Sequence, residues 1–231
     1  MRTILLIAAF LLLLGSMSVP DAITAPADEN RYSAVYLDPH YGGRKNGPNV
    51  DNKNKGKEVT LSLARAISLK LQASQVAAFL SRDEDIDIPS GDRWFYAKKK
   101  GADIYLSLRL RQQNRDCVQI YYAGHQAKAK ANRKEVIIPL TPKKEVVLRE
   151  SRRFSELLVK NLGNDSIAAC GPAQTQKDVL FETADFPAVI MEFNITRSAK
   201  RQSYVVDPAH VELISRATAS AIKEFMAGQP R

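Results

Sequence analysis

The sequence predicts an α/β fold, a single three-layer α/β/α domain built around a mostly parallel sheet. Three observations predict it. Short runs of β-branched, aliphatic and aromatic residues end at turn residues, segments with helical spacing lie between them, and the two kinds alternate along the chain. A chain of 231 residues, 45% of them hydrophobic, is also long enough to bury one full core.

The central element is the first expected strand, residues 34–37, which runs into a turn that contains Asp38, Pro39 and His40. In an open α/β sheet, ligands bind beyond the carboxyl ends of the strands, so His40 lies where a site would be. We expect two more strands, at residues 103–109 and 187–192, to end at the same edge. The side chains at these three strand ends therefore decide the function.

The remaining elements follow from spacing and composition. Apolar residues at helical spacing predict helices at 59–71, 92–100 and 150–162, and a last helix that starts at Pro208 with Asp207 as its N-cap. Apolar runs predict further strands at 76–80, 118–122 and 179–181. Residues 44–57 form a polar loop, and residues 124–144 form a basic connection with a small apolar island at 136–140.

The first 27 residues are expected to be a signal peptide. Arg2 precedes an apolar run at residues 4–14, and Ala25-Pro26-Ala27 offers a cleavage site of the A-x-A type. A retained membrane anchor is the alternative, but the apolar run is short for a membrane span. We therefore expect a mature domain at residues 28–231, exported to the periplasm or cell envelope, with no stable membrane span after cleavage.

The charge is concentrated in one segment. The net charge is +9, and residues 109–160 contain thirteen Lys and Arg against five Asp and Glu, a local net charge of +8. This distribution suits an anionic partner, but not a nucleic acid, because neither interleaved aromatic residues nor a nucleic-acid-binding motif accompanies it. Cys117 and Cys170 can form a disulfide in an exported protein, or remain two buried thiols.

Two common ligand loops are excluded. Gly56-Lys57 is followed by Glu58, which does not fit a phosphate-binding loop. Carboxylates at alternate positions from Asp83 suggest a calcium loop, but the sixth position is Ile88 rather than Gly and the twelfth is Trp94 rather than Glu. Residues 82–87 are therefore expected to form a charged loop, with Arg82 paired locally.

Several short blocks, in order, resemble a known family. They are Leu37-Asp38-Pro39 with Gly42-Gly43, Lys57-Glu58-Val59-Thr60-Leu61, Ser81-Arg82-Asp83-Glu84-Asp85, Lys100-Gly101-Ala102-Asp103 leading to Ser107-Leu108, Ser151-Arg152-Arg153-Phe154, and Asp185-Phe186-Pro187-Ala188-Val189 leading to Glu192. In these blocks the chain is similar to the catalytic domain of zinc-dependent N-acetylmuramoyl-L-alanine amidases, which cut the amide between the peptidoglycan sugar and its stem peptide. The resemblance covers nearly the whole mature chain.

The resemblance implies three zinc ligands that this chain lacks. The positions aligned with the family's first histidine, glutamate and second histidine are Tyr41, Gly56 and Arg109. His40 comes one residue before the first position. The family's catalytic glutamate has its match at Glu192. Zinc hydrolysis needs three protein ligands and an open position, and a guanidinium cannot ligate a cation. We expect neither zinc nor another cofactor, and an Arg109–Glu192 ion pair in place of the metal.

The sequence thus predicts an amidase-like domain that binds peptidoglycan, another anionic cell-wall polymer or a cell-wall enzyme without hydrolysis. His40, Tyr41, Arg44, Arg109 and Arg111 are the expected binding residues.

Two alternatives stay open. One is an active amidase with a rearranged zinc site formed by His40, Glu58 and Glu192. The other is an envelope scaffold that no longer contacts glycan. The family is hydrolytic, but the loss of the aligned ligands favours an inactive protein.

Overall fold

The fold is organised around a six-stranded sheet in the order β2-β1-β3-β8-β4-β7. The computed structural model describes residues 33–52, 54–113, 117–123, 127–131, 134–138, 141–175, 184–195 and 204–228. The strands of this sheet are β1 (Ser33–Pro39), β2 (Val76–Leu80), β3 (Ile104–Gln112), β4 (Val118–Ala123), β7 (Ala169–Thr175) and β8 (Ala188–Ile195). Strands β2, β1, β3 and β8 run parallel, whereas β4 is antiparallel to β8 and parallel to β7. The predicted α/β class with a mostly parallel sheet is confirmed.

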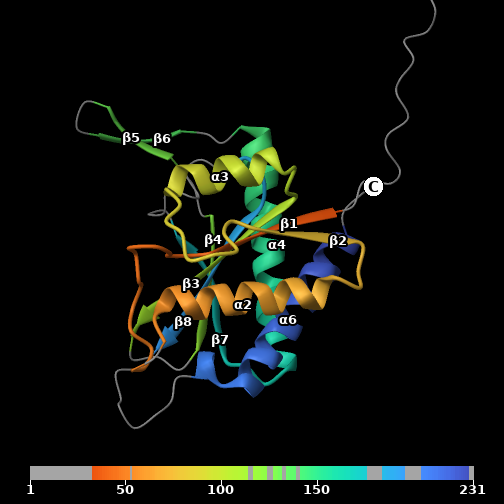
Figure 1. The fold of residues 1–231 in the computed structure, drawn as a ribbon. Helices are drawn as coiled ribbons and strands as arrows, with labels where there is room; N and C mark the ends of the chain where they lie inside the picture. Colours follow the sequence, from red (N-terminus) through yellow and green to blue (C-terminus); the bar gives the residue numbers. More distant parts are fainter. Residues whose placement is uncertain are drawn as a thin grey trace, which may run out of the picture. The chain divides into compact units, whose positions relative to one another are not determined.

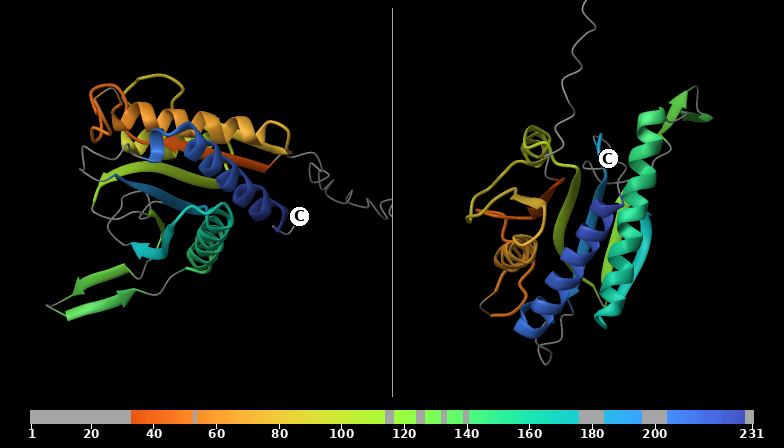
Figure 2. Two further views of the ribbon diagram at one scale, coloured as in Figure 1. Left: turned by 90° about the horizontal axis from the view of Figure 1, so that it is seen from below. Right: turned by 90° about the vertical axis from the view of Figure 1, so that its right-hand side faces the viewer.

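Three helices cover one face of the sheet. They are α2 (Gly56–Leu71), α4 (Pro142–Asn164) and α6 (Pro208–Ala227). Their inward residues share one large core with alternate residues of the strands, such as Leu37 and Leu106, which are fully buried. Figure 2 shows α4 and α6 side by side. Asp207 accepts a hydrogen bond from the Ala209 amide and so caps α6, as the sequence predicts.

Helix α3 (Ser90–Lys99) covers the opposite face (Figure 1). It packs over the first halves of β1, β3 and β8 through a smaller, aromatic core that includes Tyr36, Tyr105 and Ile190. Trp94 of α3 stacks on Phe186 at a centroid distance of 4.0 Å. Helix α3 is too short to cover the second halves of these strands. These halves carry polar side chains on this face.

The segment between β4 and α4 differs from the expectation. Residues 127–131 and 134–138, expected within an irregular connection, form the antiparallel strands β5 (Ala127–Ala131) and β6 (Lys134–Ile138) of a separate sheet. This hairpin extends away from the main sheet (Figures 1 and 2). Helix α4 begins at Pro142 instead of residue 150, because the Thr141 hydroxyl caps it and Pro142 suits the first helical turn.

Strand β7 was not predicted, since Gly171 and Pro172 interrupt its apolar pattern. Cys117 and Cys170 are joined by a disulfide, with Cα atoms 5.8 Å apart, which fastens β7 to β4 at the sheet edge. The strand predicted at 179–181 and the leader at 1–27 lie outside the described residues. In the described part of the chain, the longest helices are too short or too polar to span a bilayer.

Candidate functional site

A polar surface lies at the carboxyl ends of the central strands, on the face that α3 covers in part. Side chains alternate along a strand, so Asp38, Ser107, Arg109 and Glu192 share a face with the aromatic residues under α3. The strand register sets Asp38 opposite Ser107 and Arg109 opposite Glu192. The three strand ends therefore converge as the sequence predicts, and they define the candidate site.

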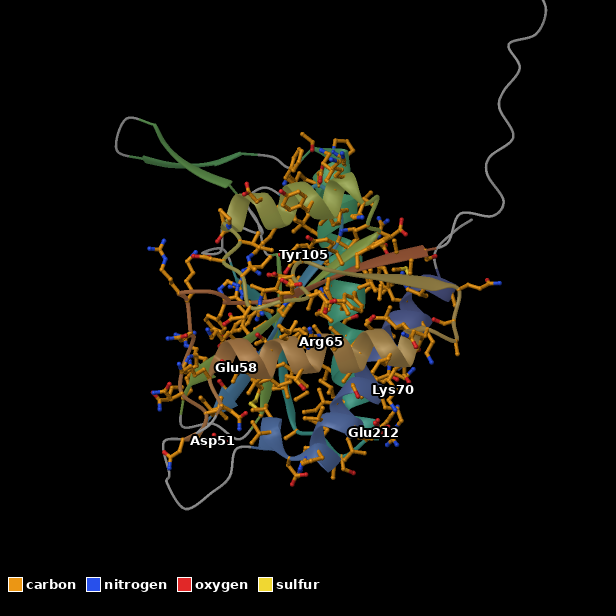
Figure 3. The ribbon with its side chains drawn as sticks, in the orientation of Figure 1. Asp51, Glu58, Arg65, Lys70, Tyr105 and Glu212 are labelled. Carbon is orange, nitrogen blue, oxygen red and sulfur yellow. A yellow bond between two sulfur atoms is a disulfide. The ribbon has the colours of Figure 1, made fainter. Side chains whose placement is uncertain are left out.

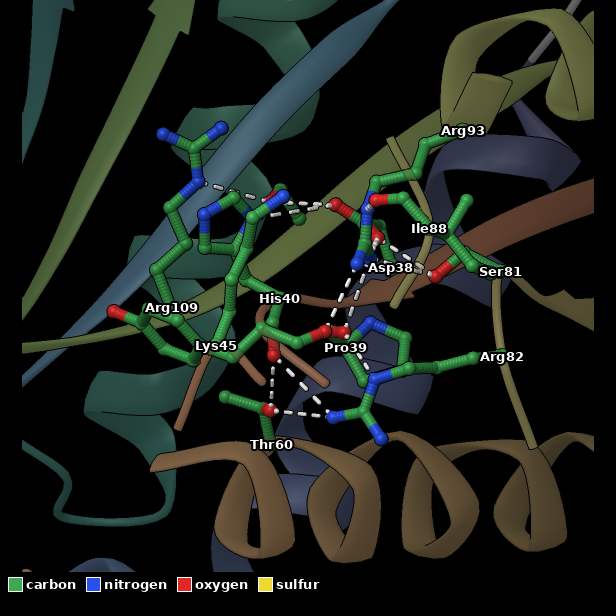
Figure 4. Close-up of polar contacts among 12 residues, drawn as sticks. Asp38, Pro39, His40, Lys45, Thr60, Ser81, Arg82, Ile88, Arg93 and Arg109 are labelled. Atoms are coloured by element: carbon green, nitrogen blue, oxygen red, sulfur yellow. Dashed lines mark hydrogen bonds and ion pairs between the residues drawn. The ribbon is translucent and has the colours of Figure 1, made fainter. Parts of the chain in front are cut away.

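Asp38 is the buried charged residue of this surface. It is 1% exposed, forms an ion pair with Arg93 of α3, and accepts hydrogen bonds from the Ser81 and Ser107 hydroxyls at 2.7 and 3.1 Å (Figure 4). Burial alone would raise the pKa of Asp38, but the neighbouring His40 and the Arg93 guanidinium outweigh it and hold that pKa well below its usual range. Asp38 is thus a charged tie between β1, β3 and α3.

Arg82 fastens the turn after β1 to helix α2. It is 2% exposed and donates to the carbonyl oxygens of Pro39, Lys57 and, from the next turn, Glu84. It also approaches the Thr60 hydroxyl (Figure 4). Burial lowers the pKa of Arg82. The prediction that Arg82 pairs locally was incomplete, because most of its acceptors lie on distant segments.

The turn itself needs glycine. Tyr41, Gly42 and Gly43 have φ angles of 70°, 122° and 55°, three successive residues in conformations that L side chains rarely adopt. A Cβ on Gly42 would lie 2.2 Å from the Ile86 carbonyl oxygen, so no other residue fits there. Lys57 and Asp85 hold the next residue: the Lys57 ammonium donates to the Gly43 carbonyl, and Asp85 accepts from the Gly43 amide at 2.7 Å.

Tyr41 fills the space between this turn and the start of α2. Its hydroxyl donates to the Leu110 carbonyl at 2.6 Å. A Cβ on Gly47 would lie 2.8–2.9 Å from three ring carbons of Tyr41, and a Cβ on Gly56 would lie 3.2 Å from one of the same carbons, Cε2. The ring therefore packs on both glycines. Tyr41 and Gly56, which the sequence predicts to occupy the family's first two zinc-ligand positions, thus lie next to each other.

Arg109 and Glu192 lie beside Tyr41. Burial raises the pKa of the Tyr41 phenol, the Glu192 carboxylate adds to this effect, and the Arg109 guanidinium opposes it. Arg109 Nε donates to the Ser107 hydroxyl at 3.1 Å. Glu192, whose side chain is 12% exposed, lies 3.6 Å from Arg111 Nη1. The shared face and register of Arg109 and Glu192 agree with the sequence, while their direct ion pair stays a prediction.

The other candidate residues have local roles. His40 lies at the end of β1, with Nδ1 3.9 Å from Asp38 and its ring edge-on to Tyr41. Arg44 lies on the exposed tip of the turn, between Gly42 and Lys45, which pair with each other. Arg111 is exposed at the end of β3. His40, Tyr41, Arg109 and Arg111 thus border one surface, and Arg44 is on a loop that begins there.

The three residues of the alternative zinc site, His40, Glu58 and Glu192, are not brought together in this structure. Glu58 lies at the exposed N-terminal end of α2 (Figure 3) and accepts a hydrogen bond from the Lys55 amide at 2.8 Å. It caps its own helix, as a glutamate at the third helical position commonly does. Among the described residues no group of three or more His, Cys, Asp and Glu side chains is gathered closely enough to hold a metal, so His40, Glu58 and Glu192 do not converge.

Zinc does not fit the residues at the aligned positions either. The Tyr41 ring packs against the Cα of Gly56, where a glutamate side chain would have to emerge. A phenol that donates to a backbone carbonyl is not a ligand, and the third position is a guanidinium that repels cations. The donor set is therefore unsuited to zinc.

Sequence reasoning missed three residues that shape the site: Arg93, Gly47 and the full role of Arg82. Arg93 lies four residues before Ala97, and both are on the buried face of α3, so helical spacing with an apolar neighbour was the available signal. Gly47 had no signal, because its role depends on the position of the Tyr41 ring.

A three-layer α/β domain with a polar surface at the carboxyl ends of its parallel strands is typical of an enzyme fold. Residues 35–224 match the family described as N-acetylmuramoyl-L-alanine amidase. This chain belongs to that family.

Two curated relatives illustrate the match. This chain is 21% identical over 227 residues to the N-acetylmuramoyl-L-alanine amidase AmiC of Neisseria meningitidis. The aligned region covers 85% of this chain and 53% of the relative. The chain is 38% identical over 74 residues to the amidase AmiA of Escherichia coli, 32% of this chain and 26% of that protein. The chain therefore spans about half, or less, of the length of the curated relatives it matches.

Solved structures support the fold. The catalytic domain of CwlV, an N-acetylmuramoyl-L-alanine amidase from Bacillus (Paenibacillus) polymyxa, has a TM-score of 0.66 at 17% identity and covers 85% of this chain and 99% of that one. The amidase AmiC2 of Nostoc punctiforme has a TM-score of 0.62 at 18% identity, with 85% and 98% covered. The predicted amidase-like fold is confirmed.

Proposed function

We propose that this chain is an exported, non-catalytic member of its family that binds peptidoglycan. One observation carries the proposal: the Tyr41 ring, held by the Leu110 carbonyl, packs on Gly47 and Gly56 in place of two family ligands. The third aligned position, Arg109, carries a guanidinium that cannot ligate a cation and repels one. Glu192 keeps the family's catalytic glutamate position and lies next to Arg111. Without a metal ion to polarise the amide and activate water, this carboxylate is not sufficient for hydrolysis.

The same residues support binding. A cleft surface that in the family accepts a glycan-linked peptide here carries Arg109 and Arg111, whose guanidinium groups suit carboxylates. Stem peptides contain carboxylates, so the exchange of metal ligands for arginine converts a cation site into a surface for anions. Arg44, on the adjoining turn, adds a third positive charge. Glu192 keeps part of this charge balanced through Arg111.

The test is co-sedimentation of the mature domain with purified peptidoglycan sacculi over a salt series, together with chromatography of any released peptides. Binding is expected at low salt and should weaken as exposed charges are screened. Arg44→Glu and Arg111→Glu, each made alone, should reduce it, whereas Lys223→Glu, which changes the charge by the same two units on the exposed side of α6, serves as the control.

The outcomes separate the candidate functions. Peptide release above that of a Glu192→Ala control would show an active enzyme and refute the proposal. Absence of sedimentation at low salt would favour a scaffold that binds protein instead of glycan.

Metal analysis supplies an independent test. The purified domain should contain no stoichiometric zinc, and chelator should leave its thermal midpoint unchanged. One zinc per chain, lost together with thermal stability in chelator, would contradict the misfit at Tyr41, Gly56 and Arg109.

A further inference from the structure

A second surface, distant from the strand ends, combines exposed aromatic rings with lysines. We define the α3 patch as Phe95, Tyr96, Lys98, Lys99 and Lys100, together with Lys143 of α4. Phe95 and Tyr96 are 61% and 45% exposed, and their rings meet edge to face at a centroid distance of 5.8 Å. The three lysines follow in the next helical turn and are exposed.

The patch has an excess of positive charge. The Asp185 carboxylate accepts a hydrogen bond from Lys98 Nζ at 2.6 Å and lies 3.9 Å from Lys143 Nζ. One carboxylate therefore pairs with two lysines, which belong to different helices. Lys100 lies over the Phe79 ring at 5.3 Å. Lysine in a last helical turn is favoured by the helix dipole, but that effect does not explain two large aromatic side chains in solvent beside it.

We propose that the α3 patch docks this domain on an anionic lipid bilayer. Aromatic side chains are stable at the level of lipid headgroups, and lysines around them gain from the negative surface potential. A sugar polymer suits the patch less well. Phe95 and Tyr96 are inclined at 65° on the convex outer side of a helix, so they offer no common flat platform for sugar rings. A lipid interface does not require one.

The position of the patch gives the docked domain an orientation. Immediately after α3, the Asp103 amide donates to the Ala34 carbonyl, and the Asp103 carboxylate accepts from the Ala34 amide at 2.7 Å. The end of α3 that carries the lysines therefore lies at the edge where β1 begins, whereas the candidate site lies where β1 ends. A domain docked through the α3 patch would direct the site away from the bilayer. The inference goes beyond the proposed function, because a lipid surface and sacculi are separate ligands.

The experiment is flotation of the mature domain with vesicles of phosphatidylcholine alone or of an equimolar mixture with phosphatidylglycerol. Trp94, the only tryptophan of the chain, lies on α3 and reports proximity through quenching by brominated lipid. Binding is expected on the mixed vesicles and not on the neutral ones. Lys99→Glu changes the charge by two units and should weaken binding about 25-fold, at about 5-fold for each unit. Phe95→Ser should weaken it roughly tenfold.

Two controls are matched to these variants. Leu69, on α2, has the same relative exposure as Phe95, 61%, so Leu69→Ser removes a similarly exposed apolar side chain elsewhere, and Lys223→Glu matches the charge change of Lys99→Glu. Both should bind as the wild type does, and all variants should keep its thermal midpoint. The proposal is overturned if all variants bind the mixed vesicles equally, or if the wild type does not bind them. It is also overturned if Lys99→Glu and Phe95→Ser lose binding to sacculi while they keep binding to vesicles. If Phe95→Ser still binds sacculi, the proposed function stands whether or not this variant loses binding to vesicles.

Discussion

The contact between Tyr41 and Gly47 can be tested by a double-mutant cycle, because the Tyr41 ring is what a Cβ on Gly47 would meet first. Its three nearest atoms would be ring carbons of Tyr41 at 2.8–2.9 Å, and Gly47 has a φ of +71°. Gly47→Ala therefore has two costs. The left-handed backbone costs about 1–2 kcal/mol for any L side chain, and the overlap with the ring costs about 1–3 kcal/mol.

Only the overlap depends on the ring. In a Tyr41→Ala background, Gly47→Ala should cost only the backbone part, about 1–2 kcal/mol, which gives a coupling energy of about 2 kcal/mol. Tyr41→Phe is the matched control. It keeps the ring and removes only the hydroxyl that donates to Leu110, so the penalty of Gly47→Ala should stay at its wild-type value.

The assay is urea unfolding followed by Trp94 fluorescence, with the free energy of unfolding taken from midpoint and slope. An equal penalty of Gly47→Ala in the wild-type and Tyr41→Ala backgrounds would refute the placement of the Tyr41 ring. The Tyr41 ring would then no longer be a steric obstacle to zinc.

Three further perturbations test the surroundings of the site. The pKa of Asp38 is lowered on folding, so the unfolded chain binds the proton first and stability falls as pH drops below about 4; Asp38→Asn should flatten this acid limb in urea titrations at several pH values. Replacing Cys117 and Cys170 by serine opens a link across 53 residues and should lower the free energy of unfolding by about 4 kcal/mol in the chain-entropy model, measured by urea unfolding. Arg109→Ala should lower the free energy of unfolding by about 1–3 kcal/mol, because it removes one of two guanidinium groups near the largely buried Glu192 carboxylate and leaves Arg111, at 3.6 Å; additivity with Glu192→Ala in a cycle would count against their pairing.

Much of the fold was predictable because its signals are local. The strands at the centre of the sheet are short apolar runs that end at turns, and the predicted helices show apolar residues at helical spacing. The cap of α6 by Asp207 followed from residue type alone. The hairpin of β5 and β6 was not predictable in this way, since alternating Ala and Lys in residues 127–131 carries little hydrophobic signal.

The site was predictable in its members but not in its contacts. Strand ends placed His40, Arg109 and Glu192 at one edge, as topology requires. The partners of those residues depend on side chains from loops and other helices. The sequence could not show that Glu58 caps its own helix or that Arg111, two residues beyond Arg109 on the same face, approaches Glu192.

Tyr41 packs on Gly56 and has Arg109 as a charged neighbour, which leads to a last prediction about the metal. Tyr41→His alone removes the ring from Gly56 but leaves no carboxylate there and leaves Arg109 charged. Gly56→Glu alone places a side chain against the Tyr41 ring, at a Cβ distance of 3.2 Å. Neither single variant should bind zinc in equilibrium dialysis, because fewer than three ligands are present and a guanidinium faces the cation. Only the triple variant with Arg109→His carries a full ligand set, so it alone should gain affinity. Stoichiometric zinc in either single variant would mean that other residues complete a site, and that Tyr41, Gly56 and Arg109 do not decide whether this protein binds zinc.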